Sequence, residues 1–184
     1  IRACGFPLAA PSANLSNRLS PTTAQHVASQ LGDQIPLIVD GGDCNVGIES
    51  TVVDVTGSSP RILRPGMISS DAILATCSCG DADAVRDSSS VAGPLRSPGL
   101  LEKHYSPRAK LRTLKWRDEA SLLAALQSAG IPPHRAFVLA HSHIPLGDHF
   151  QQVNVIPHDP EAFARGLYAE LHRCDESGAE WVIV

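Results

Sequence analysis

A loop rich in hydroxyl and amide side chains follows an apolar run near the start of the chain. Residues 6–10 are apolar and are predicted to form a buried strand that stops at Pro11. The small polar residues that follow are Ser12, Asn14, Ser16 and Ser20, with Arg18 among them. A strand, a polar loop and a helix N-terminus together offer hydroxyls and free backbone N–H groups to a bound anion. The same residues would also serve as caps and turns, so the local pattern leaves both interpretations open.

The helix expected after this loop has recognisable start and stop signals. Ser20 suits the N-cap, and Pro21 suits the first helical position, where a missing N–H costs nothing. Residues 22–31 have a helical pattern that Gly32 is placed to end. We therefore expect a helix whose N-terminus faces the polar loop.

Two further segments carry polar residues next to predicted strands. A short strand is expected at 35–39, and it runs into Asp-Gly-Gly-Asp at 40–43, where glycine permits close approach to a ligand. Residues 49–55 and 61–64 are predicted to form a hairpin around a turn at 57–60. The polar residues of interest on this hairpin are Ser50, Thr51 and Arg64. The residues alone do not decide between substrate contacts and ordinary strand positions with one surface charge.

The composition changes after a short helix that Ser70 is expected to cap and that runs through Ala75. Residues 77–99 are dominated by Ser, Asp, Ala, Gly and Pro without hydrophobic periodicity, which is typical of a linker or long loop. The linker closes with His104 and Tyr105 side by side, and Tyr105 is either a functional residue or a packing anchor.

Beyond residue 110, predicted strands and helices alternate. The predicted strands are 111–114, 136–140, 153–156 and 181–184, and the predicted helices are 118–129 and one that Asp159 caps and Gly178 ends. In that second helix Phe163, Leu167 and Leu171 recur every four residues, so this stripe is assigned to the core. Such alternation predicts a small doubly wound α/β domain.

Composition and charge bound the class of protein. The chain has 184 residues, 43% of them apolar and 18% charged, and a net charge of −4, which is ordinary for a soluble globular protein. No apolar run approaches membrane-spanning length, and the first residue is Ile, so we expect a fragment of a longer chain. Residues 95–117 hold seven Lys or Arg against one acid, which fits a solvated linker or a phosphate-binding surface.

Neither the cysteines nor the histidines have a metal-binding spacing. The five cysteines are odd in number and scattered, and Cys77-Ser-Cys79 is not a C-x-x-C pair, so they indicate reduced thiols in a cytosolic protein. The histidines considered for a metal site are His141, His143, His149 and His158. Their spacing matches no metal site that we can defend.

The polar segments occur in an order that resembles a known family. They are Pro11-Ser12-Ala13-Asn14, Asp40-Gly41-Gly42, Gly-Ile-Glu-Ser-Thr-Val-Val-Asp at 47–54, Ile-Leu-Arg-Pro-Gly at 62–66, and 97–107. Together they resemble the YrdC-like threonylcarbamoyl-AMP synthases in their longer two-domain form. The resemblance implies an α/β fold: residues 1–76 as the C-terminal part of a YrdC-like open domain, 77–110 as a linker covering the active site, and 111–184 as a small Rossmann-like domain.

The resemblance also implies an activity. The family joins L-threonine, bicarbonate and ATP, with Mg²⁺, into threonylcarbamoyl-adenylate and pyrophosphate, and its members are nucleotidyltransferases. The resemblance also implies a cytoplasmic protein without a membrane partner. The product passes to a tRNA threonylcarbamoyl transferase complex, which modifies adenosine 37 of tRNAs that read ANN codons. Such a reaction needs orientation and N–H or positively charged partners more than an acid–base pair.

Individual residues inherit expected roles from the resemblance. Contacts to ATP are implied for Ser12, Asn14, Ser20, Arg64 and Tyr105, and contacts to threonine for Ala10, Ser50 and Thr51. Tyr105 would fold over the nucleotide as a lid, with His104 beside it, and Ser12, Ser50 and Arg64 would face one hollow. The chain departs from the family pattern at Asn17, where Gly is usual but Asn tolerates positive φ, and at Asp43, where Pro is usual.

Two rival functions remain open from the sequence. One is an RNA-binding module of the same fold, since YrdC-like domains resemble double-stranded RNA binders and the linker is basic. The other is a carbamoyltransferase-type enzyme, although the zinc-finger-like cysteine pairs of such proteins are not seen here. Because the family's triphosphate-gripping basic residues precede Ile1, we expect this fragment alone to be inactive.

Overall fold

The C-terminal part of the chain is built on a parallel sheet. The computed structural model describes residues 2–57, 60–76, 86–87 and 105–184, and most of the predicted linker lies outside these ranges. The strands are β4 (Lys110–Arg112), β5 (Ala136–Ala140), β6 (Gln152–Val155) and β7 (Trp181–Ile183), in the spatial order β4-β7-β5-β6. All three pairings are parallel, which confirms the doubly wound α/β domain.

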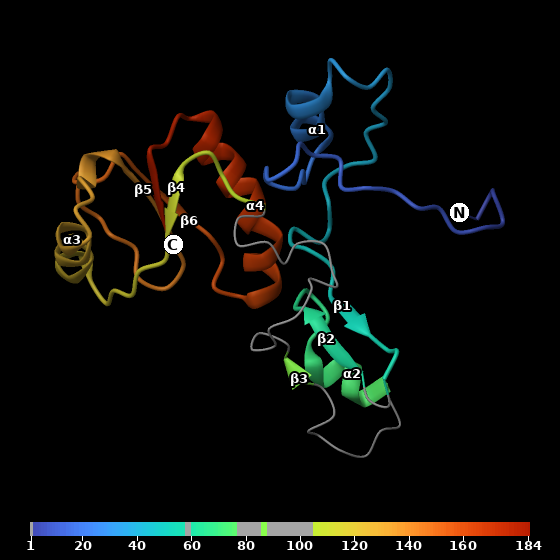
Figure 1. The fold of residues 1–184 in the computed structure, drawn as a ribbon. Helices are drawn as coiled ribbons and strands as arrows, with labels where there is room; N and C mark the ends of the chain where they lie inside the picture. The colour runs from blue at the N-terminus through green and yellow to red at the C-terminus, as the bar shows by residue number, and fades with distance from the viewer. Residues whose placement is uncertain (1, 58–59, 77–85, 88–104) are drawn as a thin grey trace.

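Two helices cover the opposite faces of this sheet. Helix α3 (Glu119–Ser128) buries Leu122 and Leu126 against Val138 and Ile183, and helix α4 (Pro160–Glu176) packs on the other face (Figure 1). The predicted stripe of α4 is confirmed as core: Leu171 is buried, and Phe163 and Leu167 pack against the same cluster. A one-turn 3₁₀ helix, η2 (Pro133–Arg135), leads into β5.

Asp159 and Gly178 mark the ends of α4 as predicted, whereas Asp118, expected inside the other helix, is the N-cap of α3. The Asp118 carboxylate accepts a hydrogen bond from the Ser121 N–H, and Asp159 does the same for Ala162. Gly178 adopts a φ of 72° just beyond α4, a conformation that favours glycine.

The N-terminal part contains the predicted hairpin. Strand β1 (Val52–Asp54) pairs antiparallel with β2 (Arg61–Arg64), and the tip at 58–59 lies outside the described residues. A two-residue strand, β3 (Arg86–Asp87), pairs parallel to β2 inside the stretch predicted to be linker. Helix α2 (Ser70–Thr76) lies between β2 and β3 in the chain. The N–H of Ala72 donates to the hydroxyl of Ser69, so Ser69 takes the capping role expected of Ser70.

The predicted start of the first helix is wrong. Helix α1 spans Ala24–Leu31, and its N-cap is Thr23, whose hydroxyl accepts from the His26 N–H. Ser20 therefore lies ahead of the helix, and the helix dipole does not act at its hydroxyl. Threonine is also a good N-cap residue, and the Ser20 hydroxyl is bonded elsewhere, to Glu49.

Two predicted strands do not form. Residues 6–10 and 35–39 are irregular and largely exposed, with Leu37 at 73% and Val39 at 81% exposure. A strand needs a neighbour to satisfy its N–H and C=O groups, and no described strand lies beside either segment. Apolar composition alone therefore did not determine their structure.

Helix α4 also contacts the N-terminal part. Leu19, which is 2% exposed, packs in the same cluster as Leu171 and Cys174 of α4, so α4 lies between the sheet and the polar loop (Figure 1). Among the described residues, no helix has the length and apolar character needed to cross a membrane.

Candidate substrate-binding site

Glu49 lies at the centre of a group of polar side chains just ahead of β1. The Ser20 hydroxyl donates a hydrogen bond to Glu49 Oε1 at 2.5 Å, and Arg64 Nη2 lies 3.8 Å from Glu49 Oε2. The Arg64 and Glu49 side chains are only 13% and 21% exposed. We call Ser20, Glu49, Ser50 and Arg64 the Glu49 cluster.

Arg64 is oriented by two bonds to one residue. Its Nε donates to the Ser50 carbonyl oxygen at 3.1 Å, and its Nη2 donates to the Ser50 hydroxyl at 3.0 Å. The hairpin register, which pairs Val52 with Arg64, brings the guanidinium beside the residues that precede β1. The planar fork is thus fixed in direction, as binding of two oxygens of an anion requires.

The backbone around Ser50 is held from a second side. A Cβ on Gly66 would collide with the backbone of residues 49–51, so this position requires glycine. The Thr51 hydroxyl donates to the Ile68 carbonyl at 2.9 Å and accepts from the Ile68 N–H at 3.1 Å. Both hydrogen bonds of the Thr51 hydroxyl are therefore made to the backbone of Ile68.

Helix α4 of the C-terminal part lies against the segment that leads into Glu49. A Cβ on Gly47 would meet the carbonyl oxygens of Ala164 and Arg165, and Arg165 Nε donates to the Asn45 carbonyl at 3.1 Å. The two parts of the chain therefore touch through backbone atoms, without room for a side chain at Gly47.

Tyr168 extends this contact to the Glu49 cluster. Burial first, then the negative charge of Glu49 and the neighbouring Tyr105, raise the pKa of Tyr168 to about 12, while Arg64 acts in the opposite direction. The phenol consequently keeps its proton at neutral pH and is able to donate a hydrogen bond. Tyr105, at a φ of 50°, lies within electrostatic range of the same group.

The remaining predicted site residues lie apart from this cluster. Ala10 and Ser12 are exposed, and the Asn14 amide donates to the carbonyls of Leu15 and Arg18, which closes its own loop. Among the described residues, no hydrogen bond or ion pair joins Ala10, Ser12 or Asn14 to the Glu49 cluster. The structure therefore brings Ser20, Ser50 and Arg64 together around Glu49, and it places Tyr105 within electrostatic range of Tyr168. It leaves Ala10, Ser12 and Asn14 apart from them.

The loop that holds Asn14 still shows two features of interest. Asn17 adopts a φ of 63°, which confirms the expected tolerance of Asn at this turn. The Asn14 Oδ1 atom is buried and accepts no hydrogen bond from any described residue. His104 lies outside the described residues.

Sequence reasoning overlooked Glu49 and Tyr168. Glu49 stands inside a motif already singled out, and an acid directly before a candidate binding serine was an available signal. Tyr168 follows Leu167 in the apolar stripe, and nothing in its spacing shows that α4 faces a second partner. Among the described residues, no group of three or more His, Cys, Asp or Glu is placed to hold a metal ion.

The fold and this cluster define an α/β protein of two parts, in which a helix of the second part packs over polar residues of the first. A family model described as telomere recombination matches residues 1–66, and the model for the C-terminal domain of threonylcarbamoyl-AMP synthase matches residues 68–184. The chain belongs to the threonylcarbamoyl-AMP synthase family.

Individual relatives agree with this assignment. The chain is 34% identical to threonylcarbamoyl-AMP synthase of Bacillus subtilis, over 100% of the chain and 53% of that protein. It is 33% identical to the Schizosaccharomyces pombe enzyme of the same name, over 97% of the chain and 47% of that protein. The crystal structure of Pyrococcus abyssi Sua5 complexed with L-threonine superposes with a TM-score of 0.72 at 28% identity, covering 94% of this chain and 50% of that one. The chain thus spans about half the length of the curated relatives it matches.

Proposed function

We propose that the protein carrying this sequence is an L-threonylcarbamoyladenylate synthase. It would form threonylcarbamoyl-AMP and pyrophosphate from L-threonine, bicarbonate and ATP, for the modification of adenosine 37 in ANN-decoding tRNAs. The observation that carries the proposal is the match of the two parts of the chain, in order, to two family domains. Relatives named for this activity support it, as does the similar structure that holds L-threonine.

The geometry of the Glu49 cluster suits this chemistry. If Ser50 contacts threonine and Arg64 contacts the ATP phosphates, their 3.0 Å hydrogen bond brings the threonine carbamate and the α-phosphate to one place. A carbamate oxygen would then attack the α-phosphorus as pyrophosphate departs, and the Arg64 guanidinium would stabilise charge on the phosphate oxygens. Tyr168, protonated at neutral pH, would add an O–H donor beside Glu49.

The other expected contacts complete the proposal. Ser12, Asn14, Ser20 and Tyr105 would contact ATP, and Ala10 and Thr51 would border the threonine pocket. For Thr51 this would be a backbone contact, because its hydroxyl is bonded to Ile68. Mg²⁺ would bind together with the ATP phosphates, as is usual for this ion. Among the described residues, no group of three or more acids, histidines or cysteines is placed to hold it without them.

Part of the basic segment is engaged in packing, which favours the synthase over an RNA-binding module. Arg108 Nη2 donates to the Asp175 carbonyl at 3.0 Å. Lys110 Nζ lies 3.9 Å from Glu180 and 4.8 Å from the centre of a Trp181 ring. Both side chains remain more than half exposed, but each already has an acidic or carbonyl partner within the C-terminal part.

The test uses the protein expressed from its complete coding sequence. Pyrophosphate release should depend on both threonine and bicarbonate, and the 184-residue chain alone should release none. Ser50→Ala should mainly weaken threonine binding and Arg64→Ala mainly ATP binding, each by about tenfold or more. Ser128→Ala, on the exposed face of α3, is the matched control and should change neither. Salt-sensitive RNA binding without threonine-dependent turnover would overturn the proposal.

A further inference from the structure

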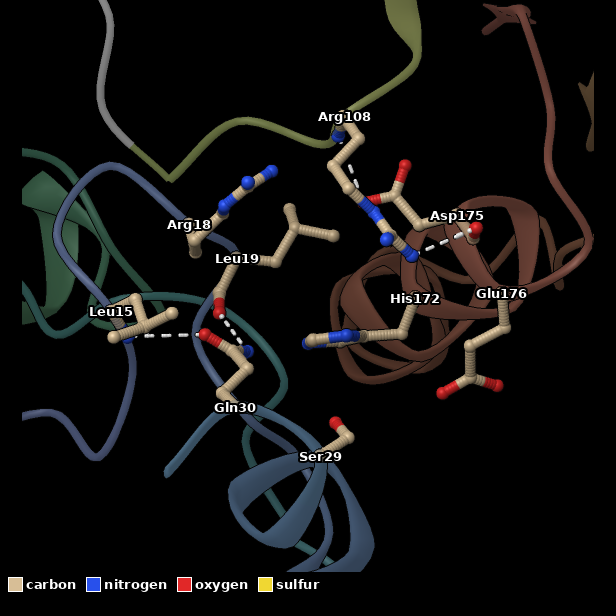
Figure 2. A pocket seen from close by; sticks show the side chains of 9 residues that line it. All are labelled: Leu15, Arg18, Leu19, Ser29, Gln30, Arg108, His172, Asp175 and Glu176. Carbon is tan, nitrogen blue, oxygen red and sulfur yellow. Dashed lines mark hydrogen bonds and ion pairs between the residues drawn. The ribbon is translucent and has the colours of Figure 1, made fainter. Parts of the chain in front are cut away.

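Two buried histidines stack across the contact between the two parts of the chain. His26 of α1 and His172 of α4 have ring centroids 3.8 Å apart with an angle of 17° between the ring planes. They are 9% and 7% exposed. Figure 2 shows the His172 ring extending from α4 toward Ser29 and Gln30 of α1.

Hydrogen bonds assign a donor nitrogen in one ring and an acceptor nitrogen in the other. His172 Nε2 lies 3.0 Å from the Ser20 carbonyl oxygen, and because a carbonyl only accepts, His172 Nε2 carries the proton. The Thr22 N–H donates to His26 Nδ1 at 3.3 Å, so that nitrogen accepts and the His26 ring is neutral. The Thr22 hydroxyl lies 3.2 Å from the same nitrogen.

These bonds connect α4 to the Glu49 cluster. His172 holds the Ser20 carbonyl, while the hydroxyl of the same serine donates to Glu49 at 2.5 Å. We propose that His172, stacked on His26, is a positioning residue for adenylate formation, which orients Ser20 toward Glu49 and Arg64 from the C-terminal side of the contact. The inference rests on the proposed function, since the orientation matters only if this cluster binds ATP.

Charged groups surround the pair on several sides. Burial, and then His172, lower the pKa of His26, whereas Glu176 of α4 and Asp43 of the segment between α1 and β1 act to raise it. Beside His172 lies a cavity of about 210 Å³, lined by Arg18, Arg108, Asp175 and Glu176 among others (Figure 2).

Protonation should weaken the arrangement. A proton on His26 Nδ1 removes the acceptor of the Thr22 N–H in a buried site. The native state resists protonation of His26, whereas the unfolded state binds a proton near pH 6.5. The stabilising effect is consequently present above about pH 6.5 and is lost as the pH falls below that value.

The test compares conservative and disruptive variants of the protein expressed from its complete coding sequence. His172→Gln keeps an N–H donor for the Ser20 carbonyl, and His26→Asn keeps an acceptor for the Thr22 N–H, yet neither side chain titrates. His172→Leu removes the donor. We expect His172→Leu to raise the KM for ATP about tenfold with little change in the KM for threonine, and His172→Gln to stay within about twofold of wild type.

The pH profile separates positioning from packing. Because the pKa of His26 in the folded protein lies below its ordinary value of 6.5, the KM for ATP of the wild type should rise only at a pH lower than that. The His26→Asn/His172→Gln double variant should lose that rise. His134→Gln, an exposed histidine of η2, is the matched control and should keep it. If His172→Leu does not fold, the double variant still decides the question.

The outcomes are distinguishable. An active wild type with equal ATP KM values in His172→Leu and His172→Gln, or a double variant that keeps the pH dependence, overturns the inference and leaves the proposed function standing. A wild type that releases no threonine-dependent pyrophosphate overturns the proposed function, and the inference with it.

Discussion

Arg165 Nε on α4 donates to the backbone carbonyl of Asn45, 120 residues earlier in the chain, at 3.1 Å. Two residues further on, Gly47 lies against the Ala164 and Arg165 carbonyl oxygens, where a Cβ would find no space. Because Gly47 leads directly to Glu49, the fit of α4 at this point determines where the Glu49 cluster sits.

The first prediction follows from this contact. Gly47→Ala should reduce the free energy of unfolding by about 1–3 kcal/mol, because the added methyl meets fixed backbone atoms rather than a side chain that can move. Urea unfolding measures the loss. Gly41→Ala is the control, since its Cβ would stand in open space, and it should stay within about 0.5 kcal/mol of wild type. Equal losses in the two variants would contradict the packing seen at Gly47.

The second prediction concerns the effect of the Glu49 charge on the pKa of Tyr168. The chain has two tyrosines, so Tyr105→Phe leaves Tyr168 as the only phenol in an ultraviolet pH titration. That background already lacks the effect of Tyr105 on Tyr168, and there Glu49→Gln should lower the Tyr168 pKa further, because it removes the negative charge that opposes ionisation. The fall should be partial, since burial is the larger cause.

The same titration has a matched control. Glu161→Gln alters an acid in the first turn of α4 that is not among the groups acting on Tyr168, and the Tyr168 pKa should not change. An unchanged Tyr168 pKa in Glu49→Gln would mean that α4 does not approach the Glu49 cluster as the structure shows.

Local signals were sufficient to predict most of the C-terminal domain. Asp118 and Asp159 cap their helices by bonds within three residues, and β5 occupies the predicted residues 136–140. Each feature depends on neighbours in sequence, so composition and spacing could reveal it.

Contacts between distant segments were not predictable in the same way. Residues 35–39 have the composition of a strand but have no described strand beside them, and strand pairing is a property of the partner as well as of the segment. Ser20 is a plausible cap, yet its hydroxyl bonds to Glu49, 29 residues away. The apolar stripe of α4 predicts the face that packs on the sheet. It does not predict that Tyr168 and His172 contact residues of the N-terminal part.

The third prediction is an acid-dependent loss of stability in the hairpin. The Thr56 side-chain and backbone bonds, followed by Arg61, lower the Asp54 pKa to about 2. A lowered native pKa contributes stability above the unfolded value of 3.8, and this contribution is lost as the pH falls from there toward 2. Asp54→Asn should therefore be less stable than wild type at about pH 6, and the difference should shrink below about pH 3.

Urea unfolding at several pH values measures this difference. Asp148→Asn is the control, because Asp148 is exposed and has no hydrogen bond or ion pair to a described residue. A gap between Asp54→Asn and wild type that stays constant down to about pH 2 would contradict the assigned bonds of Asp54.

The fourth prediction uses Cys174 as a reporter of the core beneath α4. Among the described residues Cys4 and Cys44 are free and exposed, whereas Cys174 is free but fully buried in the cluster that contains Leu19 and Leu171. Burial, and then the charges of Glu170 and Asp175, raise the pKa of Cys174 to about 12, so almost no thiolate is present at about pH 8. Alkylation followed by mass spectrometry should find Cys174 at least about a hundredfold slower than Cys44, and the difference should disappear in urea. Comparable rates in the native protein would show that α4 separates readily from Leu19, which would contradict a fixed contact between α4 and the polar loop.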